Sequence, residues 1–288
     1  MVNVLITGAS GFIAQNVATR LHSNLEFKMW VAGLSRNTSI NGYDRLYSCD
    51  LTNNNDVSSL INEVIKDAIQ FDIIIHCASE MADSNNIHSL NFFENNLSIT
   101  KNVMRIVENL KIPKLIHFSS IAVYPNKEGF YNEESKVQPS ENADALYGLS
   151  KVNAENLFDF LLKTTCSTIS HLRVAHVYGD GMRKDRTYAI MKNEMLNDNK
   201  ITVWGMGERV MNFIQIDKLA ELVEIFCLEN WNGIFNVGDK NYTFKELVEK
   251  IAKDAGLNPE IILVDKGLKT KVLINCDKLN NYIKNRNI

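Results

Sequence analysis

The chain has 288 residues and a formal net charge of −3, and its charged residues of both signs are interspersed. This length allows one large α/β domain or two smaller ones, and the lack of a basic excess argues against a nucleic-acid-binding surface. Five scattered cysteines without metal-type spacing argue for a reducing compartment and against a disulfide framework or a zinc site. No apolar run reaches the roughly 18 residues of a membrane helix, and no signal-peptide pattern precedes the first strand. We expect a soluble, cytoplasmic protein that binds no nucleic acid, membrane or metal.

The N-terminal pattern is a short apolar strand, a glycine turn and a helix. The strand covers residues 2–6, the turn covers residues 7–11, and apolar residues at helical spacing follow through Leu21. Glycines let a backbone approach a pyrophosphate closely, and the N–H groups at a helix N-terminus attract anions. The third glycine usual in such turns is Ala14, which is still small. The pattern predicts a dinucleotide-binding turn.

The second predicted strand, residues 28–34, ends in Ser35-Arg36-Asn37. An acidic residue at this strand end binds the ribose hydroxyls of NAD, whereas an arginine accommodates the 2′-phosphate of NADP. No Asp or Glu lies here, so the strand end favours NADP(H), with NAD(H) as the alternative. An exposed loop arginine without a role is the competing interpretation of Arg36.

Strands and helices continue to alternate through residue 174. Strands are predicted at 45–49, 71–79, 114–118 and 168–174, with helices around 57–64, 89–110 and 144–162. The run 71–79 is almost entirely apolar, as is typical of a parallel strand buried on both faces. The alternation predicts an α/β fold with a doubly wound parallel sheet, and Ser119-Ser120 at a strand end falls at the edge where ligands bind.

Tyr147 and Lys151 lie four residues apart on the last of these helices and therefore on one face. A free tyrosine holds its proton up to about pH 10, and a nearby cation lowers that pKa towards neutral pH. Such a tyrosine can exchange a proton with a carbonyl or alcohol oxygen while a hydride moves at the carbon. The competing interpretation is an ordinary solvated helix face.

Beyond residue 178 the alternation loosens. A helix is expected to end at Leu196, strands at 201–204, 213–217 and 233–238, and a helix through Phe226 capped by Asp217. Thr243 and Glu246 have the spacing of a capping box. We expect a nucleotide-binding domain at 1–177 and a smaller, mainly substrate-binding α/β region at 178–288, with some chain exchanged between them.

Taken together, six motifs resemble the extended short-chain dehydrogenase/reductase superfamily, in its sugar-nucleotide epimerase/dehydratase/reductase branch. The resemblance covers nearly the whole chain and rests on residues 7–13, 50–51, 76–79, 118–124, 147–151 and 172–179, with Asn96 to Thr100 in an Asn-x-x-x-Thr helix. It implies that Tyr147 is the acid/base, that Lys151 lowers its pKa and binds the nicotinamide ribose, and that Ser120 holds the reacting oxygen.

The resemblance also implies the binding residues. Those for the cofactor are Gly8, Ser10, Gly11, Phe12, Ile13, Ser35, Arg36, Asp50, Leu51, Cys77, Ala78, Ser79, Asn96, Ser119, Tyr147, Lys151 and Val174. Those for the substrate are Ser79, Ser120, His176, Arg183 and Arg209. Relatives that bind a nucleotide diphosphate often carry Arg-Asp where this chain has Met211-Asn212, so Arg183, Arg186 or Arg209 would replace that arginine. His176 stands where relatives commonly have Asn and is equally compatible with a structural role.

Two departures from the patterns of related enzymes narrow the range of possible reactions. Sugar 4,6-dehydratases place Asp-Glu after the catalytic hydroxyl, and fucose-synthase-like enzymes place a Cys two residues after it, whereas Ser120 is followed by Ile121-Ala122. The resemblance therefore implies an NADPH-dependent reductase of a keto group on a nucleotide-linked sugar, most plausibly a 4-keto-6-deoxyhexose. The alternatives are an NAD-dependent nucleotide-sugar 4-epimerase and a non-catalytic NADP-binding regulatory protein. A homodimer through the two long helices is also implied.

Overall fold

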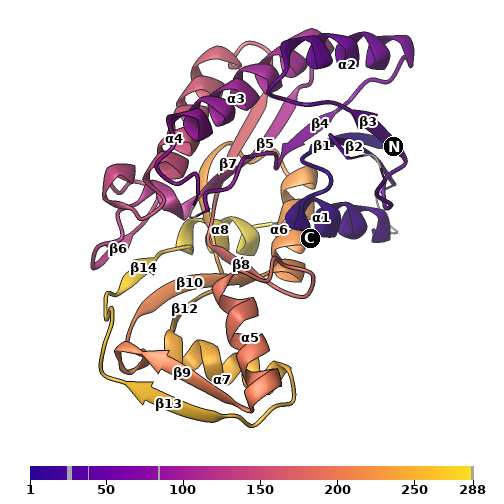
Figure 1. Ribbon diagram of the computed structural model, residues 1–288. Helices are drawn as coiled ribbons and strands as arrows, with labels where there is room; N and C mark the ends of the chain where they lie inside the picture. Colours follow the sequence, from indigo (N-terminus) through magenta and orange to yellow (C-terminus); the bar gives the residue numbers. More distant parts are fainter. Residues whose placement is uncertain (25–27, 38, 84, 287–288) are drawn as a thin grey trace. The chain divides into compact units, whose positions relative to one another are not determined.

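The computed structural model describes residues 1–24, 28–37, 39–83 and 85–286. They group into two compact units (Figure 1). Unit 1 comprises Met1–Pro125, Val137–Val174 and Asp217–Phe235, and unit 2 comprises Asn126–Lys136, Ala175–Ile216 and Asn236–Ile288. Each unit is therefore discontinuous in sequence.

Unit 1 is built on a seven-stranded sheet in the order β11-β7-β5-β4-β1-β2-β3. Its strands are β1 (Val2–Thr7), β2 (Met29–Ser35), β3 (Arg45–Ser48), β4 (Ile73–His76), β5 (Lys114–Ser120), β7 (Thr168–Val174) and β11 (Gly233–Val237). The pairs from β3 through β1 to β7 are all parallel. The predicted α/β fold with a large parallel sheet is confirmed. The strand order reverses between β1 and β4, where ligands bind in open α/β sheets.

Helices cover both faces of this sheet. They are α1 (Phe12–Ser23), α2 (Asn54–Lys66), α3 (Leu90–Leu110), α4 (Ala145–Leu161) and α6 (Ile216–Leu228), with short 3₁₀ turns η1 (Ile121–Val123) and η2 (Pro139–Glu141). Figure 1 shows α2, α3 and α4 on one face and α1 and α6 on the other. An ion pair of 2.8 Å between Arg20 and Glu224 joins the latter two helices. Among the described residues, no helix has the length and apolar character needed to cross a membrane.

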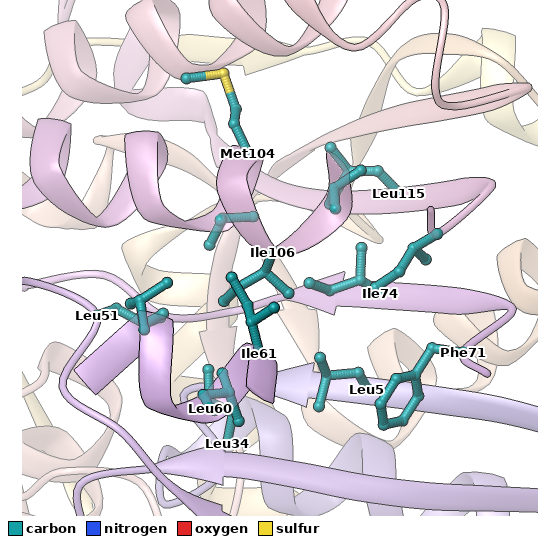
Figure 2. Packing of buried hydrophobic residues seen from close by; sticks show 14 of the residues in the cluster. Leu5, Leu34, Leu51, Leu60, Ile61, Phe71, Ile74, Met104, Ile106 and Leu115 are labelled. Carbon is teal, nitrogen blue, oxygen red and sulfur yellow. The ribbon is translucent and has the colours of Figure 1, made fainter. Parts of the chain in front are cut away.

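The face under α2, α3 and α4 holds a continuous apolar core (Figure 2). Alternate residues of neighbouring strands, such as Leu5, Ile74 and Leu115, point into it and are fully buried. Helix residues spaced three and four apart, such as Val103 and Ile106, belong to the same buried cluster and pack on the helix side of it. Full burial of one side chain of this size stabilises the folded state by roughly 1.5–3 kcal/mol. The many side chains of this core therefore hold the strands in fixed register.

Unit 2 contains smaller sheets and a second apolar cluster. Its elements are β6 (Gly129–Tyr131), β8 (His176–Tyr178), α5 (Thr187–Asp198), β9 (Lys200–Trp204), η3 (Gly205–Gly207), β10 (Val210–Gln215), β12 (Lys240–Thr243), α7 (Phe244–Asp254), β13 (Glu260–Val264), β14 (Val272–Ile274) and α8 (Asp277–Lys284). Strand β10 lies between β12 and β8, and β9 pairs in parallel with β13.

Two predictions about helix N-termini in the C-terminal half of the sequence have different outcomes. The capping box at α7 is confirmed, because Thr243 Oγ1 accepts from the Glu246 N–H at 3.1 Å and Glu246 Oε2 accepts from the Thr243 N–H at 2.8 Å. Asp217 is not the N-cap of α6, since the helix already begins at Ile216 and Asp217 lies in its first turn. An acidic residue in the first turn interacts favourably with the positive end of the helix dipole, so Asp217 can stabilise α6 without capping it.

Candidate active site

The glycine turn lies at the carboxyl end of β1. Gly8 has φ of +71°, and a Cβ there would lie 2.9 Å from the backbone of Ala78 at the end of β4. Gly11 is the N-cap of α1 and, within the described residues, brings no side-chain cap to its first N–H groups. A narrow backbone cradle below an uncapped helix N-terminus fits a pyrophosphate. The turn is therefore suited to the dinucleotide that the sequence predicts.

The end of β2 presents the residues predicted to select the cofactor. The Ser35 hydroxyl donates to Ser10 Oγ at 3.0 Å, which joins the β2 end to the glycine turn. The side chain of Arg36 is 79% exposed and lies 3.9 Å from Asp50, a loose ion pair. Its guanidinium can therefore turn towards a phosphate at little cost, because exposed pairs of this kind contribute about 0–1 kcal/mol.

A set of hydrogen bonds fixes the end of β4 beside this turn. Thr7 Oγ1 lies 2.8 Å from His76 Nδ1 and accepts from the Ala78 N–H at 3.1 Å. Asn96 on α3 accepts from the Ser79 hydroxyl and from the Glu80 N–H, each at 2.9 Å. The predicted cofactor residue Asn96 thus holds the loop after β4 in position.

Helix α4 carries the Tyr-x-x-x-Lys pair and packs against the turn that follows Ser120. A Cβ on Gly148 would overlap the carbonyl oxygen of Ala122, so only glycine permits this close approach. Ser120 is the N-cap of η1, and its Oγ accepts from the Ala122 N–H at 3.1 Å. The approach of α4 to η1 brings the predicted serine and the first turn of the helix, with Tyr147, into one region of unit 1.

Lys151 is buried, with 4% of its surface exposed, so the solvated-face interpretation of the pair is wrong for the lysine. Its Nζ lies 5.3 Å from the ring centroid of Tyr147. Burial lowers the pKa of Lys151 to about 8, and the nearby Glu155 carboxylate and Cys77 thiol oppose that shift. Removing the ammonium from water disfavours its charged form. A lysine in this state can gain or lose a proton near neutral pH.

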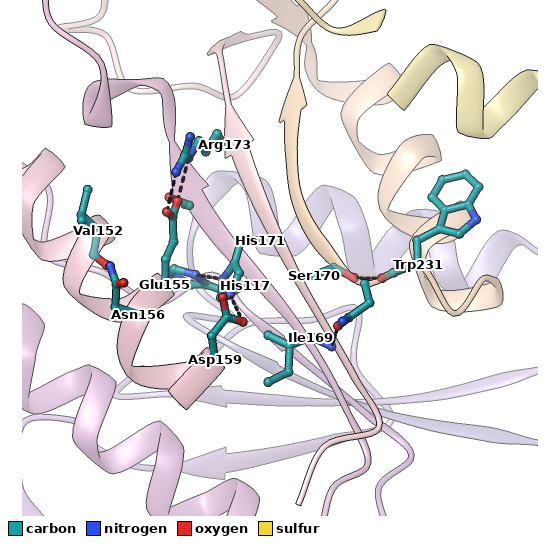
Figure 3. A network of polar contacts seen from close by, with 12 residues as sticks. His117, Val152, Glu155, Asn156, Asp159, Ile169, Ser170, His171, Arg173 and Trp231 are labelled. Carbon is teal, nitrogen blue, oxygen red and sulfur yellow. Dashed lines mark hydrogen bonds and ion pairs between the residues drawn. The ribbon is translucent and has the colours of Figure 1, made fainter. Parts of the chain in front are cut away.

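Sequence reasoning missed a buried ion pair one helical turn beyond this lysine (Figure 3). Glu155 accepts from Arg173 at 3.0 and 2.8 Å and from the Ser119 hydroxyl at 2.5 Å, and Arg173 donates to the Tyr124 hydroxyl at 3.0 Å. The network ties α4 to the ends of β5 and β7. Extending the four-residue period from Tyr147 and Lys151 would have identified its acidic member, Glu155.

The remaining predicted cofactor residues lie at strand ends or beneath them. Leu51 and Val174 are buried, and the Leu51 carbonyl accepts from Asn102 at 2.9 Å. Cys77 follows β4 directly, and burial raises the pKa of its thiol. These positions contribute backbone and apolar surface at the carboxyl edge of the sheet.

Among the predicted substrate residues of unit 2, His176 and Arg209 lie close together, since the charge of Arg209 helps to lower the pKa of His176, whereas Arg183 is engaged elsewhere. The ring of His176 on β8 lies 5.4 Å from that of Phe213. Arg183 is paired with Asp185 at 2.6 Å, and the Arg209 guanidinium lies 5.3 Å from the Phe244 ring centroid. None of these three lines the polar hollow of unit 2, of about 340 Å³, which is bounded among the described residues by Tyr178, Gly179, Asp180, Tyr188, Lys192, Gln215, Lys250, Asp254 and Ala255.

Comparisons with known proteins agree with this arrangement. The sequence model of the NAD dependent epimerase/dehydratase family matches residues 4–238. The chain is 26% identical over 260 residues to the dTDP-D-glucose 4,6-dehydratase of Dictyostelium discoideum, which covers 82% of this chain and 58% of that protein. It is 31% identical over 137 residues to the dTDP-4-dehydro-6-deoxyglucose reductase of Escherichia coli, which covers 45% of this chain and 41% of the relative. The chain thus spans little more than half of the first relative and less than half of the second.

Among solved structures, UDP-glucuronic acid 4-epimerase from Bacillus cereus in complex with NAD superposes with a TM-score of 0.75 at 22% identity, covering 96% of this chain and 90% of that one. This similarity shows the fold. The relatives carry out three different reactions, and the family match covers most of the chain. The chain therefore belongs to the NAD dependent epimerase/dehydratase family, within the extended short-chain dehydrogenase/reductase superfamily.

Proposed function

We propose that the protein is an NADPH-dependent reductase of a keto group on a nucleotide-linked sugar, specifically a 4-keto-6-deoxyhexose. The observation that carries the cofactor choice is the β2 end, where an exposed arginine replaces the acidic residue that binds the ribose of NAD. Ser10 and Ser35, joined at 3.0 Å, add hydroxyls beside Arg36. NADPH is the form of the cofactor that suits net reduction.

The residues after Ser120 support reduction over elimination. Ile121 and Ala122 occupy η1, and neither has a side chain that can exchange a proton. A dehydratase needs an acid and a base at the sugar, and an epimerase acting next to the carbonyl needs a group that removes a carbon-bound proton. What remains in this turn is the hydroxyl of Ser120, which fits transfer of a hydride and one proton.

The bound nicotinamide supplies the hydride, and the chain supplies positioning and the proton. Ser120 Oγ already accepts from the Ala122 N–H, which leaves its O–H to donate to the substrate oxygen. Tyr147 gives its proton to that same oxygen as the hydride arrives at the carbon. The ammonium of Lys151 favours the phenolate that results, because opposite charges stabilise each other strongly in a buried site.

The substrate class is argued from the family. The relatives named above act on dTDP- and UDP-linked sugars by their names. In this chain Arg183, Arg186 and Arg209 are the candidates for the diphosphate, since a guanidinium binds phosphate oxygens in a two-pronged geometry. A homodimer and a cytoplasmic location complete the proposal by resemblance.

The first test is cofactor affinity, measured by fluorescence titration of NADPH and NADH. We expect tighter binding of NADPH, and we expect Arg36→Ala to weaken NADPH about 10-fold or more without changing NADH, because a hydrogen bond to a charged group contributes about 1.5–3 kcal/mol. Arg45→Ala, which removes an exposed arginine paired with Glu63, is the matched control and should change neither affinity. Tight NADH binding that ignores Arg36 would refute the reductase and favour the 4-epimerase.

The second test separates catalysis from mere binding. Tyr147→Phe should abolish NADPH consumption with keto-sugar nucleotides and leave cofactor affinity nearly unchanged, because it removes one hydroxyl from the helix. Turnover by the Phe variant equal to wild type would exclude the acid/base role. No turnover by the wild-type protein, with intact NADPH binding, would favour the regulatory alternative.

A further inference from the structure

His117 and Lys151 line the same small cavity in unit 1. His117, on β5, is fully buried, and its Nε2 has no hydrogen-bond partner among the described residues. The cavity has a volume of about 10 Å³, and its walls include His117, Lys151, Asn96, Thr100 and Ser150. A polar space of this size holds about one water molecule.

The other ring nitrogen of His117 begins a chain of hydrogen bonds that ends at the surface (Figure 3). His117 Nδ1 lies 3.0 Å from His171 Nδ1, on β7, and His171 Nε2 lies 2.9 Å from Asp159 Oδ1, on α4. His171 is fully buried, whereas the Asp159 side chain is 53% exposed. Three elements of unit 1 thus form one path from the cavity to the surface.

With both histidine rings neutral, the hydrogen-bond rules fix the protons along this path. The Asp159 carboxylate accepts only, so His171 Nε2 carries a proton and donates it. In a neutral His171, Nδ1 is then an acceptor, and the hydrogen on this contact belongs to His117 Nδ1. In a neutral His117, Nε2 therefore carries a lone pair, in a ring that lines the cavity.

The hydroxyl hydrogens of the cavity wall are already engaged as donors. The Thr100 hydroxyl donates to the Asn96 carbonyl at 2.9 Å, and the Ser150 hydroxyl donates to the Tyr147 carbonyl at 2.7 Å. The Ser79 hydroxyl donates to Asn96 Oδ1. A water in the cavity therefore has an acceptor at His117 Nε2 and a donor at Lys151.

We propose that Asp159, His171 and His117 form a relay that presents the Nε2 lone pair of His117, through one water molecule, to the ammonium of Lys151 and so keeps that lysine charged. His117 is a positioning residue in this scheme, because it acts through Lys151. No proton needs to be transferred for the relay to work. Its consequence for turnover rests on the proposed role of Lys151, whereas its effect on the lysine proton does not.

The electrostatics around the lysine are consistent with this role. Burial, with the charge of Lys151, holds the pKa of His117 well below its ordinary value, so the ring stays neutral and accepts. Burial also lowers the pKa of His76, which stacks on His117 from β4, to about 3. The remaining titratable groups that face Lys151 are Cys77, directly after β4, and Tyr147 and Glu155 from its own helix. The carboxylate of Glu155 is engaged by Arg173, which leaves His117 as a neutral acceptor at the cavity.

The test uses NMR on the intact protein labelled with ¹⁵N at histidine and lysine, with no substrate needed. We expect His117 in the Nδ1–H tautomer and His171 in the Nε2–H tautomer. The Lys151 signal, assigned by its loss in Lys151→Met, should titrate near pH 8. His117→Phe keeps an aromatic ring and removes the lone pair, and it should lower the lysine midpoint by about one unit, since a hydrogen bond to an ion is worth at least that much.

Two further variants complete the design. His117→Gln, which can place an amide oxygen near the position of Nε2, should restore at least half of the shift. Asp159→Ala removes the exposed outer acceptor, so both histidines should become mixtures of tautomers and the lysine midpoint should fall by a few tenths of a pH unit. This variant provides a test even if the Phe variant does not fold. Asp44→Ala, which removes the carboxylate 2.9 Å from His22, is the matched control and should leave Lys151 unchanged.

An Nε2–H tautomer of His117 in the wild-type protein, or a lysine midpoint unaffected by both His117→Phe and Asp159→Ala, would overturn the relay. Lack of turnover with keto-sugar nucleotides, together with the expected NMR shifts, would instead reject the proposed function and leave the relay standing. With turnover present, the alkaline limb of the pH–rate profile should move to lower pH in His117→Phe and return in His117→Gln.

Discussion

Replacing Lys151 by methionine should stabilise the protein at neutral pH, although it removes a predicted catalytic group. Burial lowers the pKa of this lysine from 10.5 to about 8. At pH 7 the lysine is charged in both states, and the folded state bears the cost of a buried ammonium. Methionine has nearly the same length and no charge, so it fills the same space without that cost.

The size and the sign of the effect follow from proton linkage. The pKa difference is about 2.5 units, which at about 1.36 kcal/mol per unit corresponds to about 3 kcal/mol. Between pH 8 and pH 10.5 the unfolded chain holds a proton that the folded protein has lost, so wild-type stability rises with pH across this window. The advantage of Lys151→Met should therefore be fully present below pH 8 and should shrink as the pH approaches 10.5.

The assay is urea unfolding of both proteins at pH 7 and pH 10. The free-energy difference between the two proteins is compared, because all other titrating groups are common to both and cancel. Lys101→Met, at an exposed position of α3, is the control and should change stability by less than about 0.5 kcal/mol at either pH. A Met variant at position 151 that is no more stable than wild type at pH 7, with a gap independent of pH, would refute the reasoning.

Two further predictions concern the frame around this lysine. Glu155→Gln leaves a buried arginine without its counter-charge and should lower the free energy of unfolding by about 3–5 kcal/mol, measured by thermal unfolding. Glu63→Gln, in an exposed ion pair, is the control and should lower it by less than about 1 kcal/mol. Equal losses in the two variants would show that burial does not make the Glu155 pair more important for stability. Gly148→Ala should push α4 away from the turn after the predicted catalytic serine, and it should reduce kcat with cofactor affinity nearly kept. Leu149→Ala, exposed on the same helix, is the control and should leave kcat unchanged. Full activity of the Ala variant at position 148 would contradict the close approach.

The sheet of unit 1 could be predicted from the sequence because its signals are local. Apolar runs such as 71–79 and helical periods such as that after the glycine turn reflect burial on two faces or on one, and neighbouring residues alone define them. The preference for right-handed βαβ connections then limits the strand orders that such a sheet can adopt. Unit 2 is harder, since β6 pairs with β14 across 140 residues and each has only three residues. Strands this short leave too little pattern to detect.

The residues of the candidate site likewise divide into those that a local pattern defines and those that the tertiary fold brings together. The glycine turn and the Tyr-x-x-x-Lys pair are defined by spacing within one element, and the structure gives each a physical reason, in the close approach of Gly8 and the burial of Lys151. The contact between His117 and His171 depends instead on the parallel register of β5 and β7, which places these two residues opposite each other. No local pattern shows that two histidines 54 residues apart share a hydrogen bond.

Helix α4 explains why a single segment determines so much of the chemistry. Tyr147, Lys151, Glu155 and Asp159 follow one another every fourth residue, and each meets a different environment along the helix. The phenol and the ammonium lie within 5.3 Å (Nζ to ring centroid), the first carboxylate is fixed by Arg173, and the second reaches solvent beside His171. Polar groups on a buried helix face destabilise the fold unless each is paired, and Glu155 and Asp159 have partners in Arg173 and His171. The ion pair at Glu155 holds the helix in place, and the relay from Asp159 supplies the acceptor. Loss of either should therefore be visible first in the titration of Lys151 and only then in turnover.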